Sequence, residues 1–142
     1  FDSSFVIIPI LRSGIAMLTP AQKLLPNAKV GFAGLVRNEK TAVAQEYYWK
    51  IPEIKKKDVI LIIDPMLATG GSILHVVKKL LLEGARDIRI ASIVAAPEGI
   101  EKIHNEYPEI QIFTAAIDKK LNGKKYIVPG LGDFGDRYFG TD

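Results

Sequence analysis

Short apolar runs alternate with amphipathic stretches along the chain. Residues 59–63, Val-Ile-Leu-Ile-Ile, form a continuous apolar run that is typical of a strand buried on both faces of a parallel sheet. Apolar residues then recur at helical spacing over residues 72–83, and Gly84 follows as a helix stop. The same reasoning predicts strands over residues 5–10, 29–36, 45–51, 88–94 and 110–117, and helices over residues 15–25 and 98–106. This repetition predicts an α/β fold with a mainly parallel sheet and right-handed crossovers.

Some segments depart from that alternation. We expect the helix over residues 15–25 to be broken by Pro20 and stopped by Pro26. Turn-like residues 38–41, between two predicted strands, indicate a β-hairpin arm over residues 36–51. From residue 118 onward the chain is rich in glycine and is predicted to form loops. Because no linker or repeat interrupts its 142 residues, the chain is expected to fold as a single domain, 1–142.

Composition narrows the classes of function. The chain contains no cysteine, which excludes disulfides, thiol catalysis, Cys-ligated zinc and iron–sulfur clusters. The net charge is +3, but the basic residues are scattered, and the densest run, Lys55–Lys57, is interpreted as a solvated loop. No apolar run approaches the roughly 18 residues of a membrane span, and residues 1–4 do not resemble a signal peptide. We therefore expect a soluble cytoplasmic protein without nucleic-acid or membrane partners.

A candidate anion site lies where the central apolar strand ends. Residues 64–72, Asp-Pro-Met-Leu-Ala-Thr-Gly-Gly-Ser, leave this strand and open the next helix, whose N-terminal N–H groups suit a phosphate. Gly70 and Gly71 let the backbone approach an anion, and Asp64 is placed to accept hydrogen bonds from a neutral polyol such as ribose. Alternatively, Ser72 only caps the helix and the glycines only form a tight turn. A Walker loop is excluded, because Gly71 is followed by Ser72 where that motif requires lysine.

Residues 64–72 resemble the phosphoribosyl pyrophosphate (PRPP) loop of type I phosphoribosyltransferases, in the form found in uracil phosphoribosyltransferases, where proline replaces a second acid. The resemblance continues in order over residues 9–14, 46–48, 95–99 and 126–141, and so covers nearly the whole chain. It implies the type I phosphoribosyltransferase fold, with the hairpin arm and a C-terminal hood over residues 118–142 that covers the base. The family normally carries a further helical segment before the first strand, whereas this chain begins almost directly at that strand.

The resemblance also implies which residues are functional. Those expected to bind PRPP are Arg12, Arg37, Asp64, Pro65, Met66, Leu67, Ala68, Thr69, Gly70, Gly71, Ser72 and Asp133. Those expected to contact uracil, largely through the main chain, are Tyr126, Ile127, Gly132, Asp133 and Phe134. Asp64, Asp133 and Arg37 are the expected catalytic residues. Taken singly, each arginine could be an ordinary surface cation and Asp133 a turn former. Ser13 stands where the family often has alanine.

The implied reaction transfers the 5-phosphoribosyl group from PRPP to N1 of uracil, giving uridine monophosphate (UMP) and pyrophosphate in pyrimidine salvage. A transition state that resembles an oxocarbenium ion needs positioning and charge stabilisation more than a nucleophile. Accordingly, we find no nucleophile–base pair in the sequence. Mg²⁺ is expected to be carried by PRPP, with no metal ligands from the protein. His75 and His104 have no partner at metal-ligand spacing and are interpreted as core or surface residues.

The C-terminal glycines raise one further alternative. Gly130, Gly132 and Gly135 satisfy the G-x-G-x-x-G pattern, but too few residues follow them for a βαβ unit, so an NAD site is rejected. Asp136 and Arg137 are adjacent opposite charges and are expected to pin the loop rather than to react.

Other classes of function and assembly stay open. A nucleotide-sensing regulator on the same fold, with little or no catalysis, is the main alternative to an enzyme, whereas a nucleic-acid-binding module would need a clustered basic face. We expect a homodimer or a higher homo-oligomer. The aromatic residues Tyr47, Tyr48 and Trp49 make the hairpin our predicted dimer contact, with packing inside the chain as the alternative.

Overall fold

The protein folds around a mainly parallel sheet with helices on both faces. The computed structural model describes residues 4–38, 40–41 and 43–141. The strands run in the order β4-β3-β1-β5-β7-β6, β2 pairs with β1, and β8 pairs with β7. Their bounds are β1 Phe5–Leu11, β2 Lys29–Val30, β3 Phe32–Arg37, β4 Ala44–Lys50, β5 Val59–Ile63, β6 Met66–Leu67, β7 Asp87–Ala95 and β8 Gln111–Ile117. All pairs in this sheet are parallel except the β3–β4 hairpin, as the alternation of strands and helices predicts.

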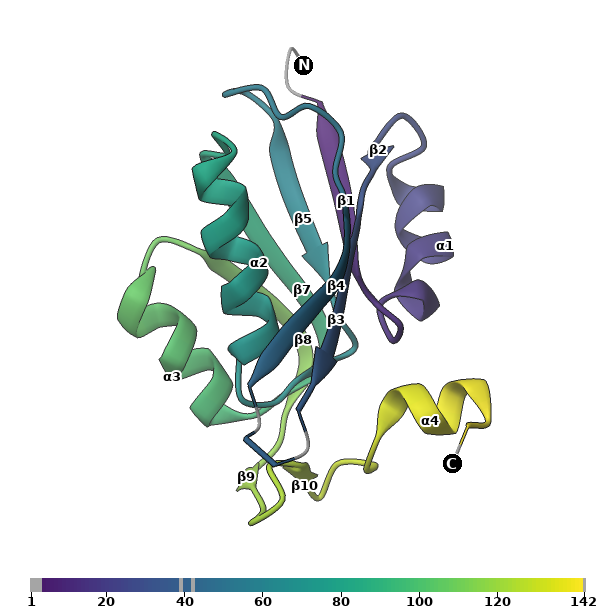
Figure 1. Cartoon of the computed structure of the whole chain (residues 1–142), viewed down its shortest axis with the longest axis vertical. Coiled ribbons are helices and arrows are strands. Elements are labelled where there is room, and N and C mark those ends of the chain that lie inside the picture. The colour runs from purple at the N-terminus through teal and green to yellow at the C-terminus, as the bar shows by residue number, and fades with distance from the viewer. Residues whose placement is uncertain (1–3, 39, 42, 142) are drawn as a thin grey trace.

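Helices α2 (Gly71–Leu82) and α3 (Pro97–Glu106) cover one face of the sheet, and α1 (Ile15–Leu24) lies against the other (Figure 1). The core lies between the sheet and α2. The face of α2 toward the sheet buries Ile73, Leu74, Val76, Val77 and Leu80, which are spaced at helical intervals. Full burial of each such side chain contributes about 1.5–3 kcal/mol relative to exposure. The core therefore fixes the first turn of α2 at the end of β5, where the candidate anion site begins.

The predicted elements near the N-terminus need two corrections. The expected strand over residues 29–36 is interrupted at Gly31 and forms the separate strands β2 and β3. Among the described strands, β2 pairs only with β1, whereas β3 pairs with the end of β1 and, along its whole length, with β4. Pro20 does not break the first helix, which continues from Ile15 to Leu24. Because α1 lies on the surface and has no buried residue, water can satisfy the carbonyl that Pro20 leaves without an intrahelical donor.

The C-terminal segment is more ordered than the predicted loops. Strands β9 (Lys120–Leu121) and β10 (Ile127–Val128) form an antiparallel pair, and the short helix α4 (Phe134–Phe139) follows them. Helix α4 is specified by the residues that cap its two ends rather than by apolar residues at helical spacing. The Asp133 carboxylate accepts a hydrogen bond from the Asp136 N–H at 2.9 Å, and Gly140 ends the helix with a φ of 66°. Residue 142, the end of the predicted hood, lies outside the described residues.

The hairpin turn is described only in part, since residue 39 of the predicted turn lies outside the described residues, as do residues 1–3. The Asn38 side chain accepts hydrogen bonds from the N–H groups of Lys40 and Thr41 at 2.9 and 3.0 Å, which is turn chemistry. Within the described part of the chain, no helix is long and apolar enough to cross a membrane.

Candidate active site

A cavity of about 710 Å³ opens at the carboxyl ends of the parallel strands, where ligands bind in open α/β sheets. Four separate segments form it: the end of β1, the end of β3 with the hairpin, the loop after β5, and the C-terminal segment. The predicted site residues that line it are Arg12, Arg37, Asp64, Met66, Ala68, Ser72, Tyr126, Ile127, Gly132, Asp133 and Phe134. Both arginines, both aspartates and the predicted pyrimidine contacts therefore face the same space.

The remaining predicted residues lie beside the cavity rather than on its wall. Leu67 is 1% exposed and belongs to the core, and the Pro65 carbonyl accepts hydrogen bonds from the N–H groups of Ile93 and Val94, both at 3.0 Å. These two residues fasten the loop to β7. Thr69 and Gly71 line a neighbouring cavity of about 690 Å³ between the hairpin, α2 and α3.

Asp64 is a buried carboxylate aimed at the cavity. Its residue is only 8% exposed, and it accepts hydrogen bonds from the Ser13 hydroxyl at 3.0 Å and, more distantly, from the Met66 N–H at 3.4 Å. Burial raises the pKa of Asp64 to about 6, because these two donors offset only part of the lost hydration. An acceptor in this state suits a ligand that brings hydroxyl donors.

The loop after Asp64 presents the first turn of α2 to the ligand. Gly70 occupies the N-cap position with a φ of 79°, a conformation that favours glycine, and α2 has no acidic residue in its first turn. Ser72 lies inside the helix and makes no cap hydrogen bond, so the alternative that it only caps α2 is wrong. The Gly71 N–H, the first of the helix, donates to the Thr69 hydroxyl at 3.3 Å. The next N–H groups of the first turn have no intrahelical acceptor, so they remain available to an anion.

Gly99 supports this loop from behind, a role that sequence reasoning missed. A Cβ atom at Gly99 would lie 2.4 Å from the Ala68 carbonyl oxygen, so only glycine allows α3 to pack this closely against the loop. The motif over residues 95–99 contained Gly99, but only the fold shows what it contacts.

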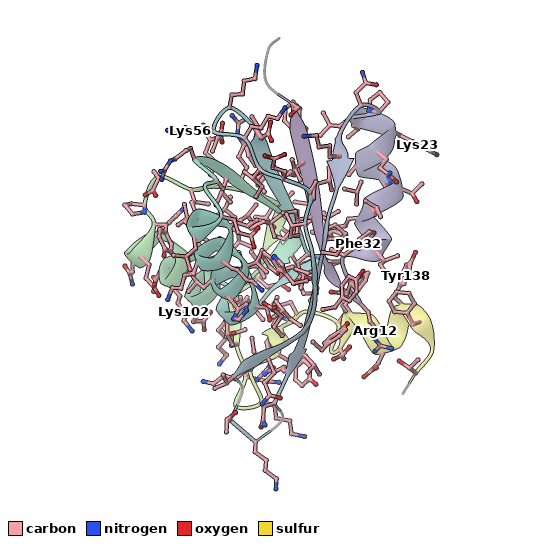
Figure 2. The ribbon with its side chains drawn as sticks, turned by 45° about the horizontal axis from the view of Figure 1, so that its top comes forward. Arg12, Lys23, Phe32, Lys56, Lys102 and Tyr138 are labelled. Carbon is pink, nitrogen blue, oxygen red and sulfur yellow. The ribbon has the colours of Figure 1, made fainter. Side chains whose placement is uncertain are left out.

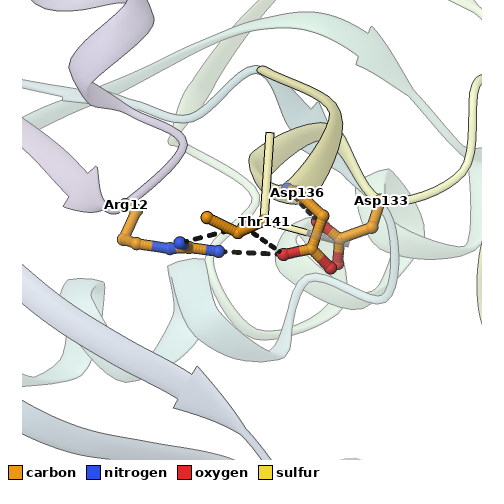
Figure 3. Close-up of polar contacts among 4 residues, drawn as sticks. All are labelled: Arg12, Asp133, Asp136 and Thr141. Atoms are coloured by element: carbon orange, nitrogen blue, oxygen red, sulfur yellow. Dashed lines mark hydrogen bonds and ion pairs between the residues drawn. The ribbon is translucent and has the colours of Figure 1, made fainter. Parts of the chain in front are cut away.

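Arg12 and Arg37 reach the cavity from adjacent strands. Arg12, which follows a cis peptide bond at the end of β1, forms an ion pair with Asp136 at 3.0 Å and donates to the Thr141 hydroxyl at 3.2 Å (Figure 3). Arg37 donates to the Lys124 carbonyl at 3.3 Å. Each guanidinium thus contacts the C-terminal segment and keeps further N–H donors for a ligand. In Figure 2, Arg12 lies beside α4.

The C-terminal hood is shaped by glycines and side-chain contacts to the backbone. Gly130 and Gly132 have φ angles of 45° and 81°, and the Gly130 N–H donates to the Asp118 carboxylate at 2.9 Å. The Arg137 guanidinium donates to the Leu131 carbonyl at 2.7 Å. Asp136 and Arg137 do hold the loop, as predicted, although each does so through a separate partner.

The hairpin is fastened to α2 by a polar cluster. The Glu46 carboxylate contacts the Lys79 ammonium at 2.5 Å and His75 Nε2 at 2.9 Å, and these contacts, Lys79 first, hold the pKa of Glu46 below its usual value. The Trp49 indole N–H donates to Glu83 at 2.8 Å while Lys79 lies over its ring. Trp49 thus packs against residues of its own chain, which is the alternative that the sequence left open for this aromatic residue.

Comparisons with known proteins bear on the family of this chain. The family model for uracil phosphoribosyltransferase matches residues 1–141. The uracil phosphoribosyltransferase of Mycoplasma mobile is 47% identical over 141 residues, which cover 99% of this chain and 68% of the relative. That of Thermosipho melanesiensis is 49% identical over 140 residues, covering 99% of this chain and 67% of the relative. The chain belongs to the uracil phosphoribosyltransferase family. It spans about two thirds of the length of these curated relatives.

Solved structures support the fold. The AQ2163 protein from Aquifex aeolicus superposes with a TM-score of 0.93 at 43% identity, covering 97% of this chain and 66% of that one. The adenine phosphoribosyltransferase from Leishmania tarentolae has a TM-score of 0.67 at 18% identity over 87% of this chain and 66% of its own, and so shares the fold alone. The predicted type I phosphoribosyltransferase fold is confirmed. The cavity of this uracil phosphoribosyltransferase family member is also lined by residues that were not predicted as site residues. They include Ser13, Tyr47 and Lys125.

Proposed function

We propose that this chain transfers the 5-phosphoribosyl group of PRPP to N1 of uracil, forming UMP and releasing pyrophosphate. The C1′–N1 bond forms as the C1′–O bond to pyrophosphate breaks, and the N1 proton is lost to solvent. The observation that carries the proposal is the convergence of Arg12, Arg37, Asp64 and Asp133, from four distant segments, on one cavity. Family membership supports PRPP and uracil as the ligands of this cavity.

The sugar phosphate is assigned to the loop after β5. Its 5′-phosphate would bind the first N–H groups of α2 and the hydroxyls of Thr69 and Ser72, where the helix dipole favours an anion. The ribose hydroxyls would donate to Asp64. With a pKa of about 6, Asp64 is ionised at neutral pH and can accept those hydrogen bonds.

The pyrophosphate is assigned to the two arginines. A guanidinium offers paired N–H donors that match phosphate oxygens, and it keeps its charge at any physiological pH. Arg12 and Arg37 would stabilise the negative charge that accumulates on pyrophosphate as the C1′–O bond breaks. This function requires no covalent intermediate.

Uracil is assigned to the hood. Backbone groups at Ile127 and over residues 132–134 would read the carbonyl–NH–carbonyl edge of the base, while Tyr126 and Phe134 cover it. Cytosine carries an amino group where uracil carries a carbonyl, so a backbone donor of the hood would be left unpaired. The hood therefore favours uracil. The glycines of the segment permit the close backbone approach that such recognition needs.

Phosphoribosyltransferases generally use PRPP together with Mg²⁺. In the described residues, no group of three or more His, Asp or Glu side chains is placed to hold a metal ion. An ion carried by the diphosphate fits, since Asp133 offers an oxygen acceptor on the cavity wall.

We further propose a cytoplasmic homodimer, with the exposed Tyr48 of the hairpin at its contact.

A direct test combines the purified chain with PRPP, Mg²⁺ and uracil and measures UMP by chromatography. We expect UMP and pyrophosphate in equal amounts, and no UMP from the variant Asp64→Asn. Binding of UMP or PRPP without turnover by fully folded protein would contradict the enzyme and favour the nucleotide-sensing regulator.

Figure 2 shows Lys23, Lys56 and Lys102 on separate parts of the molecule, which gives no support to a nucleic-acid-binding face.

A further inference from the structure

Arg12 is held by a set of contacts from the very end of the chain. Its Nη2 lies 3.0 Å from Asp136 Oδ1, its Nη1 donates to Thr141 Oγ1 at 3.2 Å, and its guanidinium lies 5.5 Å from the centre of the Phe139 ring. The Thr141 hydroxyl also donates to the same Asp136 oxygen at 2.8 Å. Arg12, Asp136 and Thr141 therefore form a closed polar triangle (Figure 3).

Helix α4, which contributes Asp136 to this triangle, is part of the hood and begins next to Asp133. The Asp136 N–H donates to the Asp133 carboxylate at 2.9 Å, and Asp133 lines the cavity. A short, continuous path of hydrogen bonds thus joins a predicted pyrimidine and PRPP contact to the arginine predicted to hold pyrophosphate. Asp136 is the residue through which this path passes.

Stability does not account for this arrangement. The side chains of Arg12 and Asp136 are 49% and 38% exposed, and an ion pair so open to solvent contributes little to folding. Its effect is on orientation instead. A guanidinium has five N–H donors, and Asp136 and Thr141 engage only two of its nitrogens through one contact each, so donors remain for phosphate oxygens.

We infer that Asp136 is a positioning residue, which holds the Arg12 guanidinium at the cavity in the orientation that receives the pyrophosphate of PRPP. The inference rests on the proposed function. A long arginine side chain that is already fixed loses less conformational entropy when it binds, so affinity for PRPP rises without a direct contact from Asp136. Asp136 acts through Arg12 and does not itself touch the substrate.

A competing role for Asp136 predicts the opposite effect. If its carboxylate instead competed with pyrophosphate for Arg12, removing Asp136 would tighten PRPP binding. The sign of the change in affinity therefore separates the two roles.

The test measures the Kd of Mg²⁺–PRPP by calorimetry in the full chain. We expect Asp136→Ala to weaken binding about tenfold, the scale of one charge-assisted contact, and Asp136→Asn, which keeps an acceptor oxygen, to weaken it about threefold. In an Arg12→Ala background, the additional Asp136→Ala change should have less than about a twofold effect, because nothing remains to be positioned.

A matched control is available far from the cavity. Asp87 pairs with Arg89 at 2.9 Å with a similarly exposed carboxylate, so Asp87→Ala should leave the Kd unchanged. Unchanged or tighter binding by folded Asp136→Ala protein, or losses that add in full to those of Arg12→Ala, would overturn the inference alone. Failure of the unaltered chain to bind PRPP would overturn the proposed function as well.

Discussion

The two ends of strand β5 each carry a buried aspartate, and the two differ in their partners. Asp58, just before β5, is 0% exposed and accepts hydrogen bonds from the Ser4 hydroxyl and from the Lys55 N–H, the latter at 2.9 Å. These bonds, that from Ser4 first, hold the pKa of Asp58 below its usual value. Asp64, just after β5, has weaker support, and burial raises its pKa to about 6.

This difference distinguishes a carboxylate that is satisfied within the chain from one that we propose binds a ligand. Asp58 is satisfied by its own chain and fastens the start of the strand. Asp64 is buried at a cost that its own chain does not fully offset, which leaves it ready to accept hydrogen bonds from a ligand. The comparison can be tested by making the same substitution at both ends of the strand.

The largest expected effect is on PRPP binding. Asp64→Asn should weaken it more than about 100-fold, because the amide replaces an anionic acceptor of ribose hydroxyls with a group that is half donor. Uracil affinity should change much less. Calorimetry with both ligands checks this, and Asp58→Asn is the matched control, with PRPP affinity unchanged. Equal losses for PRPP and uracil would refute the role assigned to Asp64.

Asp64→Asn should also stabilise the fold at neutral pH. The folded pKa of about 6 exceeds the ordinary value of 3.8, so the native state binds more protons than the unfolded state between these values. The free energy of unfolding of the unaltered chain therefore falls as pH rises through this window. The variant should gain up to about 3 kcal/mol at pH 8 and nothing below about pH 3.5. Urea denaturation across this pH range measures the gain; a gain of the same size at both extremes would contradict the assignment.

The same substitution at Asp58 should have the opposite sign. Its lowered pKa means that the stabilisation is present above the ordinary value of 3.8 and is lost as pH falls through the lower folded value. Asp58→Asn loses one of two buried acceptors and should cost about 2 kcal/mol at pH 7. Denaturation curves measured beside those of the Asp64 variant give the comparison directly, and a stabilised Asp58→Asn protein would refute it.

The smallest expected effect lies in the hood. Asp118→Ala removes the acceptor of the Gly130 N–H and should weaken UMP binding about fivefold, because the hood loses a contact that fixes its shape. Global stability should change by less than about 1 kcal/mol, since the segment lies outside the core. Fluorescence or calorimetric titration with UMP tests this, and unaltered affinity would show that the hood keeps its shape without Asp118.

The central unit of the fold could be predicted closely from sequence. The strand over residues 59–63 has the predicted bounds, and the helix after it begins at Gly71, one residue before the predicted start. Both follow from a continuous apolar run and a regular helical period, which local sequence specifies. Helix α4 was missed because its six residues have no such period and depend on the caps at Asp133 and Gly140.

In the candidate site, too, some features follow from local sequence and others depend on the fold. The resemblance of residues 64–72 predicts an anion loop, but the partners of its residues lie too far along the chain to be read from spacing. Ser13 is 51 residues from Asp64, and Asp136 is 124 residues from Arg12. Pairing across such separations is decided by the packing of the sheet and by the path of the C-terminal segment. For that reason the positioning contacts emerge only from the fold.

A crystal structure of the chain with UMP tests the central claim most directly. The account predicts that the 5′-phosphate lies within hydrogen-bond distance of backbone nitrogens over residues 69–72, with the ribose hydroxyls on Asp64 and the pyrimidine under residues 126–134. A phosphate bound anywhere other than the start of α2 would contradict it.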